Sequence, residues 1–240
     1  MRGTREDNDP PEIDPPEVSV TLLKASNLLK EQTPWSKVPH PIDILLMTKE
    51  ECELLSCISC LNVSFCKSYH EELGDLYFGE DETIKLKIAV IKYAQAGHYY
   101  ATDFAQFVNK GLEVLNPKAL LCVGYCGGLN CKKAKLGDVV VSNKLLIYTS
   151  KPTRCTLNFP MNRDMQAATR NVSVDWRASL KVPGELDLKV HTNGVFLCGP
   201  EAVDSVERRD ELTHLFPEAT AIAEEGFGKS FIRSRQQHAF

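Results

Sequence analysis

Three absences in the sequence exclude whole classes of protein. No apolar run approaches the roughly 18 residues that a membrane-spanning helix needs, so the chain is not an integral membrane protein. The N-terminus, MRGTREDNDPPEIDPPE, has no apolar core of the kind that a secretory signal peptide requires. Without secretion, the nine cysteines predict reduced thiols in a cytoplasmic protein rather than a set of disulfides.

The sequence also lacks an excess of positive charge. The first 20 residues hold six acidic and two basic residues, which accounts for the whole net charge of −4. The remaining 220 residues carry 26 residues of each sign. A neutral body provides no general field that would attract a phosphate backbone, so nucleic acid is not an expected partner.

Composition divides the 240 residues into a tail and one domain. Four of the first 17 residues are proline and most of the others are acidic or polar. Such a segment cannot bury enough apolar surface to fold. We therefore expect a disordered acidic, proline-rich tail over residues 1–37 and a single globular domain over residues 38–240.

Apolar patterns in the domain alternate between strands and helices, which is typical of the α/β class. Short apolar runs at 42–47, 86–93 and 119–123 predict buried strands, and 49–61 has helical spacing. Apolar residues recur at helical spacing over 100–115, which predicts an amphipathic helix.

The second half of the domain has weaker patterns. Asn193-Gly194, between two short apolar runs, predicts a β-hairpin. Residues 151–185 show little periodicity. Further expected elements are strands at 76–78, 139–142, 145–148 and 219–223 and a helix over 200–216.

A glycine-rich segment, Gly124-Tyr-Cys-Gly-Gly-Leu129, directly follows the strand at 119–123. Glycine lets backbone amides approach a ligand closely, and ligands bind at the carboxyl ends of strands in open α/β sheets. A tight turn without a ligand is an equally good interpretation. The segment is neither a P-loop, since no Gly-Lys-Ser/Thr follows, nor a GxGxxG motif.

Carboxylates follow two of the expected strands. Glu50, Glu51 and Glu53 open the helix after the first strand, and Glu224-Glu225 follows the last one. The plain interpretation of the first group is charge complementarity with the helix dipole. Together with the glycine segment, the two acidic strand ends also suggest a ligand-binding cleft.

The cysteines raise the question of a metal or a nucleophile. Cys52, Cys57, Cys60 and Cys66 have a spacing that a zinc site could use. Three of them lie on an expected helix among leucines, however, where cysteine behaves as a small hydrophobic residue. Cys126 has no obvious histidine partner that would activate it. We expect neither a metal nor a cofactor.

Four motifs in order resemble the nucleoside phosphorylase/nucleosidase superfamily, which includes purine nucleoside phosphorylases and methylthioadenosine/S-adenosylhomocysteine nucleosidases. They are DILLMTKEECELL, AxLLCVGYCGGL with KLGDVVVS, GVFLCGPEAV and PEATAIAEEGFG. The likeness covers about residues 38–230 and is strongest to a divergent invertebrate branch that includes ATP nucleosidases. It implies a three-layer α/β/α domain with a mixed central sheet, which cleaves a purine–ribose N-glycosidic bond.

The resemblance also implies the site residues. Glu225 matches the family's glutamate that grips the ribose hydroxyls, and Glu51 matches the residue that positions or activates water. The base and ribose cleft and the loop that closes over the nucleoside would use the remaining matched positions, which are Gly124, Tyr125, Cys126, Gly127, Gly199, Glu201 and Glu224.

The chain departs from the family pattern at several points. Tyr125 stands where classical members have a small hydroxyl residue, and Glu224 replaces a methionine. No phosphate-binding glycine–arginine pattern follows the first strand, which favours water over phosphate as the nucleophile. Nothing after Phe231 matches the family's next strand and its aspartate, so we expect a C-terminal strand and helix to be missing.

Two functions remain open within this resemblance, and an unrelated doubly wound ligand-binding domain is a third interpretation of the sequence. The chain is either a purine nucleosidase or phosphorylase, or an inactive relative that binds nucleosides as a regulatory or interaction module. The expected partner is a purine nucleoside or nucleotide, and family members commonly form homo-oligomers. Neither a membrane nor a nucleic acid is expected.

Overall fold

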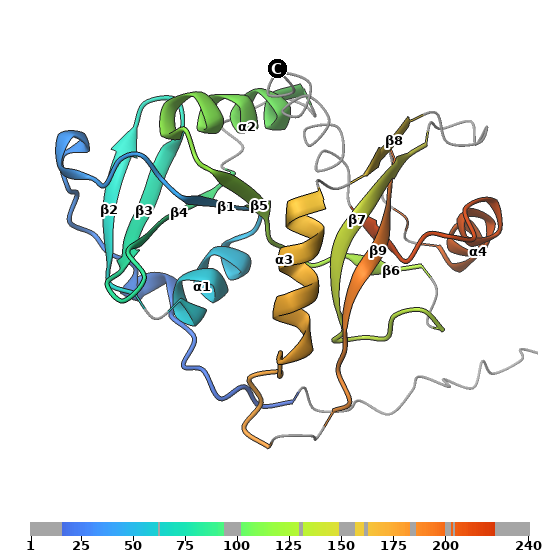
Figure 1. Cartoon of the computed structure of the whole chain (residues 1–240). Helices are drawn as coiled ribbons and strands as arrows, with labels where there is room; N and C mark the ends of the chain where they lie inside the picture. The colour runs from blue at the N-terminus through green and yellow to red at the C-terminus, as the bar shows by residue number, and fades with distance from the viewer. Residues whose placement is uncertain are drawn as a thin grey trace, which may run out of the picture.

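The computed structural model in Figure 1 contains two mixed β-sheets with helices packed on their faces. None of the helices among the described residues has the length and apolarity to cross a bilayer. The description covers residues 16–61, 63–93, 102–129, 132–148, 157–160, 163–182, 186–199, 203 and 205–223.

The first sheet has the strand order β2-β3-β4-β1-β5. Its centre is parallel, because β1 pairs with β4 on one side and with β5 on the other, and β2 and β3 add an antiparallel edge. The strands are β1 (Ile44–Thr48), β2 (Phe65–His70), β3 (Gly74–Asp81), β4 (Leu86–Lys92) and β5 (Ala119–Cys122).

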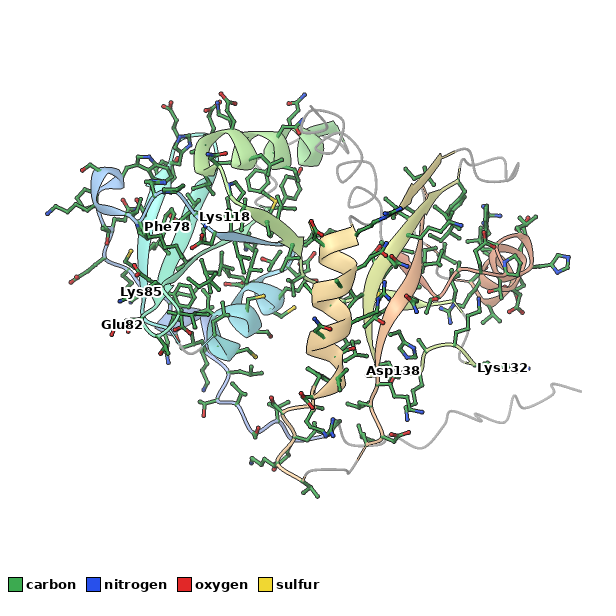
Figure 2. All side chains as sticks on the ribbon, viewed as in Figure 1. Phe78, Glu82, Lys85, Lys118, Lys132 and Asp138 are labelled. Carbon is green, nitrogen blue, oxygen red and sulfur yellow. The ribbon has the colours of Figure 1, made fainter. Side chains whose placement is uncertain are left out.

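Two helices cover opposite faces of the first sheet (Figure 1). Helix α1 (Glu51–Cys60) buries Leu54 and Ile58 against one face. Helix α2 (Thr102–Leu115) buries Val108 and Leu115 against the other, where Phe78 of β3 also packs (Figure 2). The helical spacing in the sequence predicted both helices, and the structure confirms them.

The second sheet has the order β6-β10-β9-β7-β8, with β7, β9 and β10 parallel. Helix α4 packs on one face, and α3 lies between the two sheets in Figure 1. The elements are β6 (Gly127–Gly128), β7 (Val139–Ile147), β8 (Leu157–Pro160), α3 (Arg163–Val174), β9 (Val190–Cys198), α4 (Val206–Leu215) and β10 (Ala221–Ala223).

The α/β class and the mixed pairing agree with the expected fold. The described strands, however, form two five-stranded sheets rather than one. Strand β2, strand β8 and helix α3 had no clear signal in the sequence. The two strands expected at 139–142 and 145–148 are one strand, β7, whose register shifts twice against β9.

The hairpin prediction at Asn193-Gly194 is wrong. Both residues lie inside β9, which runs continuously and pairs in parallel with β7. An added Cβ at Gly194 would lie 2.4 Å from Cγ1 of Val140 and 2.7 Å from the carbonyl oxygen of Val141. Glycine is therefore present because β9 approaches the backbone of β7 closely, and not because the chain turns.

Residues 17–33 lie along the domain, although the sequence predicted a tail up to residue 37. The N–H of Lys181 donates to the carbonyl oxygen of Glu17 (2.9 Å), and the N–H of Leu23 donates to Oγ of Ser59 in α1 (2.8 Å). Leu23 and Leu28 pack against the core beneath α1, and this apolar contact is the physical reason for the difference. Two short 3₁₀ turns follow, at Ala25–Asn27 and Trp35–Lys37.

Asp138 joins the turn before β7 to the start of β9 (Figure 2). Its carboxylate accepts hydrogen bonds from the N–H groups of Lys135 and Lys189, both 3.0 Å, and lies 2.7 Å from Nε2 of His191. The side chain is 3% exposed. Burial alone would raise the pKa of Asp138, but these hydrogen bonds outweigh it and hold the pKa below its ordinary value of 3.8.

Substitution of Gly194 by alanine should destabilise the domain, because the backbone of β7 must move to admit the methyl group. Overpacking of this kind costs about 1–3 kcal/mol, measurable as a lower midpoint of urea unfolding. Gly128→Ala is the matched control, since none of the described atoms lies within 4 Å of its added Cβ. Equal stability of the two variants would contradict the close β7–β9 approach.

Asp138→Asn should lower the free energy of unfolding by about 1–3 kcal/mol at pH 7, since an amide cannot accept all three hydrogen bonds. The folded-state pKa of Asp138 is lowered, so its contribution is present above the unfolded value of 3.8 and is lost as the pH falls through the lower folded value. Urea unfolding at several pH values should therefore show the difference shrinking in acid. Asp187→Asn, at a carboxylate that is 78% exposed, should have little effect at any pH.

Candidate active site

The glycine loop, which we define as residues 123–126, joins the two sheets. It leaves the carboxyl end of β5 and enters β6, which pairs with β10. Strand β5 pairs in parallel with β1, so the two strands end side by side. The turn that leads into α1 follows β1 at this end. The loop therefore lies at the carboxyl edge of the parallel strands, where α/β proteins bind ligands.

Glu53 connects this loop to the start of α1. Its Oε1 accepts a hydrogen bond from the N–H of Tyr125 at 3.1 Å. Its Oε2 accepts from the N–H groups of Lys49 at 2.8 Å and Glu50 at 2.9 Å. One carboxylate thus caps α1 and contacts a loop that is 72 positions further along the chain.

Glu51 lies on a different side of the same helix. Consecutive helical residues are 100° apart, so positions 51 and 53 point in nearly opposite directions. Burial raises the pKa of the Tyr77 hydroxyl in β3; the charge of Lys67 opposes this, and the negative charges of Asp75 and Glu51 make smaller contributions that raise it. Glu51 is exposed at the carboxyl edge of β1, but the carboxylate that meets the glycine loop belongs to Glu53.

The glycine loop also meets the end of β10. Gly127 pairs with Ile222, and an added Cβ at Gly127 would lie 2.8 Å from Cγ2 of that isoleucine. Next to it, Ala223 at the end of β10 pairs with Cys198 at the end of β9. The carboxyl ends of both strands therefore lie at one place, beside the glycine loop.

Gly199 directly follows β9 and is buried. An added Cβ there would lie within 2.3 Å of three atoms of the Tyr148 side chain, so only glycine fits against this ring. Tyr148 is 2% exposed and packs against Phe216, with 6.0 Å between the ring centroids. The aromatic contact fixes the path of the chain as it leaves β9.

The expected site residues divide into two groups. Six of them lie in the described part of the chain: Glu51, Gly124, Tyr125, Cys126 and Gly127 at the shared edge, and Gly199 at the neighbouring strand end. Glu201, Glu224 and Glu225 lie outside the described residues. The structure nevertheless brings the chain to within one or two residues of them, at Gly199 and Ala223.

Glu53 is the residue that the motif comparison missed. The signal in the sequence was weak, because a capping box ordinarily begins with Ser, Thr, Asp or Asn, and here a glutamate takes that position. The structure contains this capping box between Glu50 and Glu53. The plain interpretation of these two acidic residues, as groups that stabilise the start of the helix, is therefore confirmed.

The described cysteines differ in exposure, from the exposed Cys52 and Cys60 to the buried Cys198. Burial raises the pKa of Cys57 to about 11, with smaller contributions from Cys60 and Glu53, and raises the pKa of Cys122 to about 12. Burial also raises the pKa of Cys126. Among the residues that the structure describes, no three His, Cys, Asp or Glu side chains are grouped so that they could hold a metal.

The chain is similar to one curated protein. A death domain-containing ATP nucleosidase of Amphimedon queenslandica is 25% identical over 224 residues, which cover 83% of this chain and 42% of that protein. The chain thus spans less than half of the length of this relative. No family model matches the chain.

Solved nucleosidase structures share the fold. Futalosine hydrolase of Helicobacter pylori has a TM-score of 0.61 at 16% identity, over 82% of this chain and 80% of that one. The 5′-methylthioadenosine/S-adenosylhomocysteine nucleosidase of the same organism has a TM-score of 0.61 at 16% identity, over 82% and 81%. A Borrelia burgdorferi protein assigned to the same activity, with adenine bound, has a TM-score of 0.61 at 14% identity, over 81% of each chain.

These neighbours define the class of the domain, which has the α/β fold of nucleosidases with its glycine loop at the carboxyl edge of the parallel strands. The curated relative points in the same direction. These findings agree with the resemblance of the four sequence motifs, because the chain is similar to an ATP nucleosidase and shares the fold of solved nucleosidases.

The raised thiol pKa values predict which cysteines react. At pH 8, iodoacetamide should label the exposed Cys52 and Cys60 at least ~10-fold faster than Cys57 and Cys122, because only the thiolate is nucleophilic. Peptide mapping by mass spectrometry measures the four rates in one sample. Rapid labelling of Cys122 in the folded protein would show that the end of β5 is open to solvent.

Proposed function

We propose that this chain hydrolyses the N-glycosidic bond of a purine nucleoside or nucleotide, with water favoured over phosphate as the nucleophile. The observation that carries the proposal is the convergence of the glycine loop with the ends of β9 and β10 at the edge where α1 begins. The curated relative is named an ATP nucleosidase, and the solved neighbours are named nucleosidases or a hydrolase. Both support the same class of reaction.

The chemistry requires a carboxylate beside the ribose. Cleavage develops positive charge on the sugar, and a carboxylate offsets that charge while it accepts hydrogen bonds from two hydroxyls. We assign this role to Glu225, which follows β10 by two residues. Glu51, exposed at the start of α1, is the residue assigned to position or activate the attacking water.

The remaining assignments concern the shape of the site. The glycine loop, with Gly124, Tyr125 and Cys126, would line the base and ribose together with Gly127. The segment after β9, with Gly199 and Glu201, would close over the nucleoside, and Glu224 would lie beside Glu225. The expected homo-oligomer remains a prediction.

Release of the free base is the direct test. The purified chain is incubated with methylthioadenosine, adenosine, inosine and ATP, each with and without phosphate, and the products are separated by chromatography. Adenine release that does not depend on phosphate supports the proposal. Release that requires phosphate would overturn the choice of water, and no release from any substrate by a folded sample would overturn the proposed activity.

Substitution of Glu225 by glutamine should lower kcat by ~10²–10³-fold, because the amide cannot offset the charge on the ribose in the transition state. The effect on KM should be smaller, since that charge is absent from the ground state. Glu218→Gln, at an exposed carboxylate in the turn before β10, is the matched control and should retain activity. Equal kcat values for the wild type and Glu225→Gln would refute the assignment of Glu225.

A further inference from the structure

The position of the Glu53 carboxylate is unusual, because a helix cap needs only one of its two oxygens. Oε2 provides the cap by accepting from the N–H groups of Lys49 and Glu50. Oε1 is left for a second task, and it accepts from the N–H of Tyr125 in the glycine loop. The side chain is partly buried between the two segments.

The glycine loop is shaped around this carboxylate. An added Cβ at Gly124 would lie 2.5 Å from Oε1 and 3.0 Å from the carboxyl carbon of Glu53. Any side chain at position 124 would therefore displace the carboxylate from the loop. Gly124 and Glu53 are therefore coupled, because the Glu53 carboxylate can approach the loop only where position 124 has no side chain.

The bonded amide belongs to the residue that presents the largest side chain of the loop. Tyr125 is 64% exposed, at the edge where β5, β9 and β10 end. Its N–H donates to Glu53, and this hydrogen bond fixes the backbone of Tyr125 and with it the direction of the ring. The loop also connects the two sheets, and Glu53 fixes it to the first one.

We propose that Glu53 is a positioning residue, which holds the backbone of the glycine loop and thereby sets the Tyr125 side chain for ligand binding. The identity of the ligand as a purine rests on the proposed function, whereas the fixing of the loop does not. A carboxylate is required because both oxygens accept hydrogen bonds. The amide of glutamine has one acceptor and would turn an NH₂ group toward backbone N–H donors on the other side.

The alternative is that Glu53 only caps α1. Glu50 provides the matched control, because it belongs to the same capping box, whereas the carboxylate that accepts from the Tyr125 N–H is that of Glu53. Loss of capping is common to Glu50→Gln and Glu53→Gln, whereas loss of the loop contact is specific to Glu53→Gln. A comparison of the two variants therefore separates the two roles.

The experiment measures hydrogen exchange of the Tyr125 amide by NMR in ¹⁵N-labelled wild type, Glu53→Gln, Glu50→Gln and Gly124→Ala. A hydrogen bond to a charged group is lost in Glu53→Gln, so exchange at Tyr125 should accelerate by ~10–100-fold. Gly124→Ala should reproduce this acceleration with the carboxylate still present. In the double variant with Glu53→Gln and Gly124→Ala, the Tyr125 amide should exchange no faster than in either single variant. Glu50→Gln should leave the rate within ~2-fold of the wild type.

Adenine binding, measured by calorimetry on the same samples, tests the consequence for the site. We expect Glu53→Gln and Gly124→Ala to weaken adenine binding by ~10-fold and Glu50→Gln to leave it unchanged. Unchanged exchange at Tyr125 in Glu53→Gln, or equal acceleration in Glu50→Gln, would overturn the positioning role. If Glu53→Gln does not fold, Gly124→Ala alone decides, since its exchange rate must rise.

The two proposals fail in different ways. A wild type that releases no base and binds no adenine would end the proposed function, and exchange at Tyr125 would still decide whether Glu53 fixes the loop. Base release by the wild type together with unchanged exchange in Glu53→Gln would keep the activity and overturn the positioning role.

Discussion

The crossing of the chain from one sheet to the other is the constraint on which the site depends. Between β5 and β6 the backbone passes close to Glu53 on one side and to Ile222 on the other. Side chains at positions 124 and 127 would collide with these neighbours, so both positions are glycine. Glycine at these positions therefore lets the Glu53 and Ile222 side chains approach the backbone, and the tight-turn and ligand-loop interpretations of this segment are compatible.

This crossing determines which strand ends come together. Because β6 is antiparallel to β10 and β10 is parallel to β9, the end of the glycine loop lies beside Ala223 and Cys198. Because β5 is parallel to β1, the start of the loop lies beside the first turn of α1. Backbone pairing thus brings four distant segments of the sequence to one edge: the start of α1, the glycine loop, and the ends of β9 and β10.

Local sequence information predicted the elements that have a local cause. Strands β1, β4 and β5 belong to a sheet that is covered on both faces and so are continuous apolar runs. Helix α2 is buried on one face and so has apolar residues at helical spacing. Asn193-Gly194 was misinterpreted because the reason for its glycine is the backbone of Val141, some 50 residues away, which no local pattern reveals. The contact of Glu53 with the glycine loop is likewise not visible in the sequence, since only the folded helix shows that the side chains of Glu51 and Glu53 point apart.

The hydrogen bonds of Glu53 also limit its chemistry. A carboxylate offers about four lone-pair sites, and the N–H groups of Lys49, Glu50 and Tyr125 already occupy three of them. Such a group is well suited to hold a loop and poorly suited to accept two ribose hydroxyls. In the proposed hydrolysis, the charge beside the ribose is therefore assigned to a second carboxylate. Glu225 carries that assignment because it follows by two residues the end of β10, the strand that pairs with β6 directly after the glycine loop.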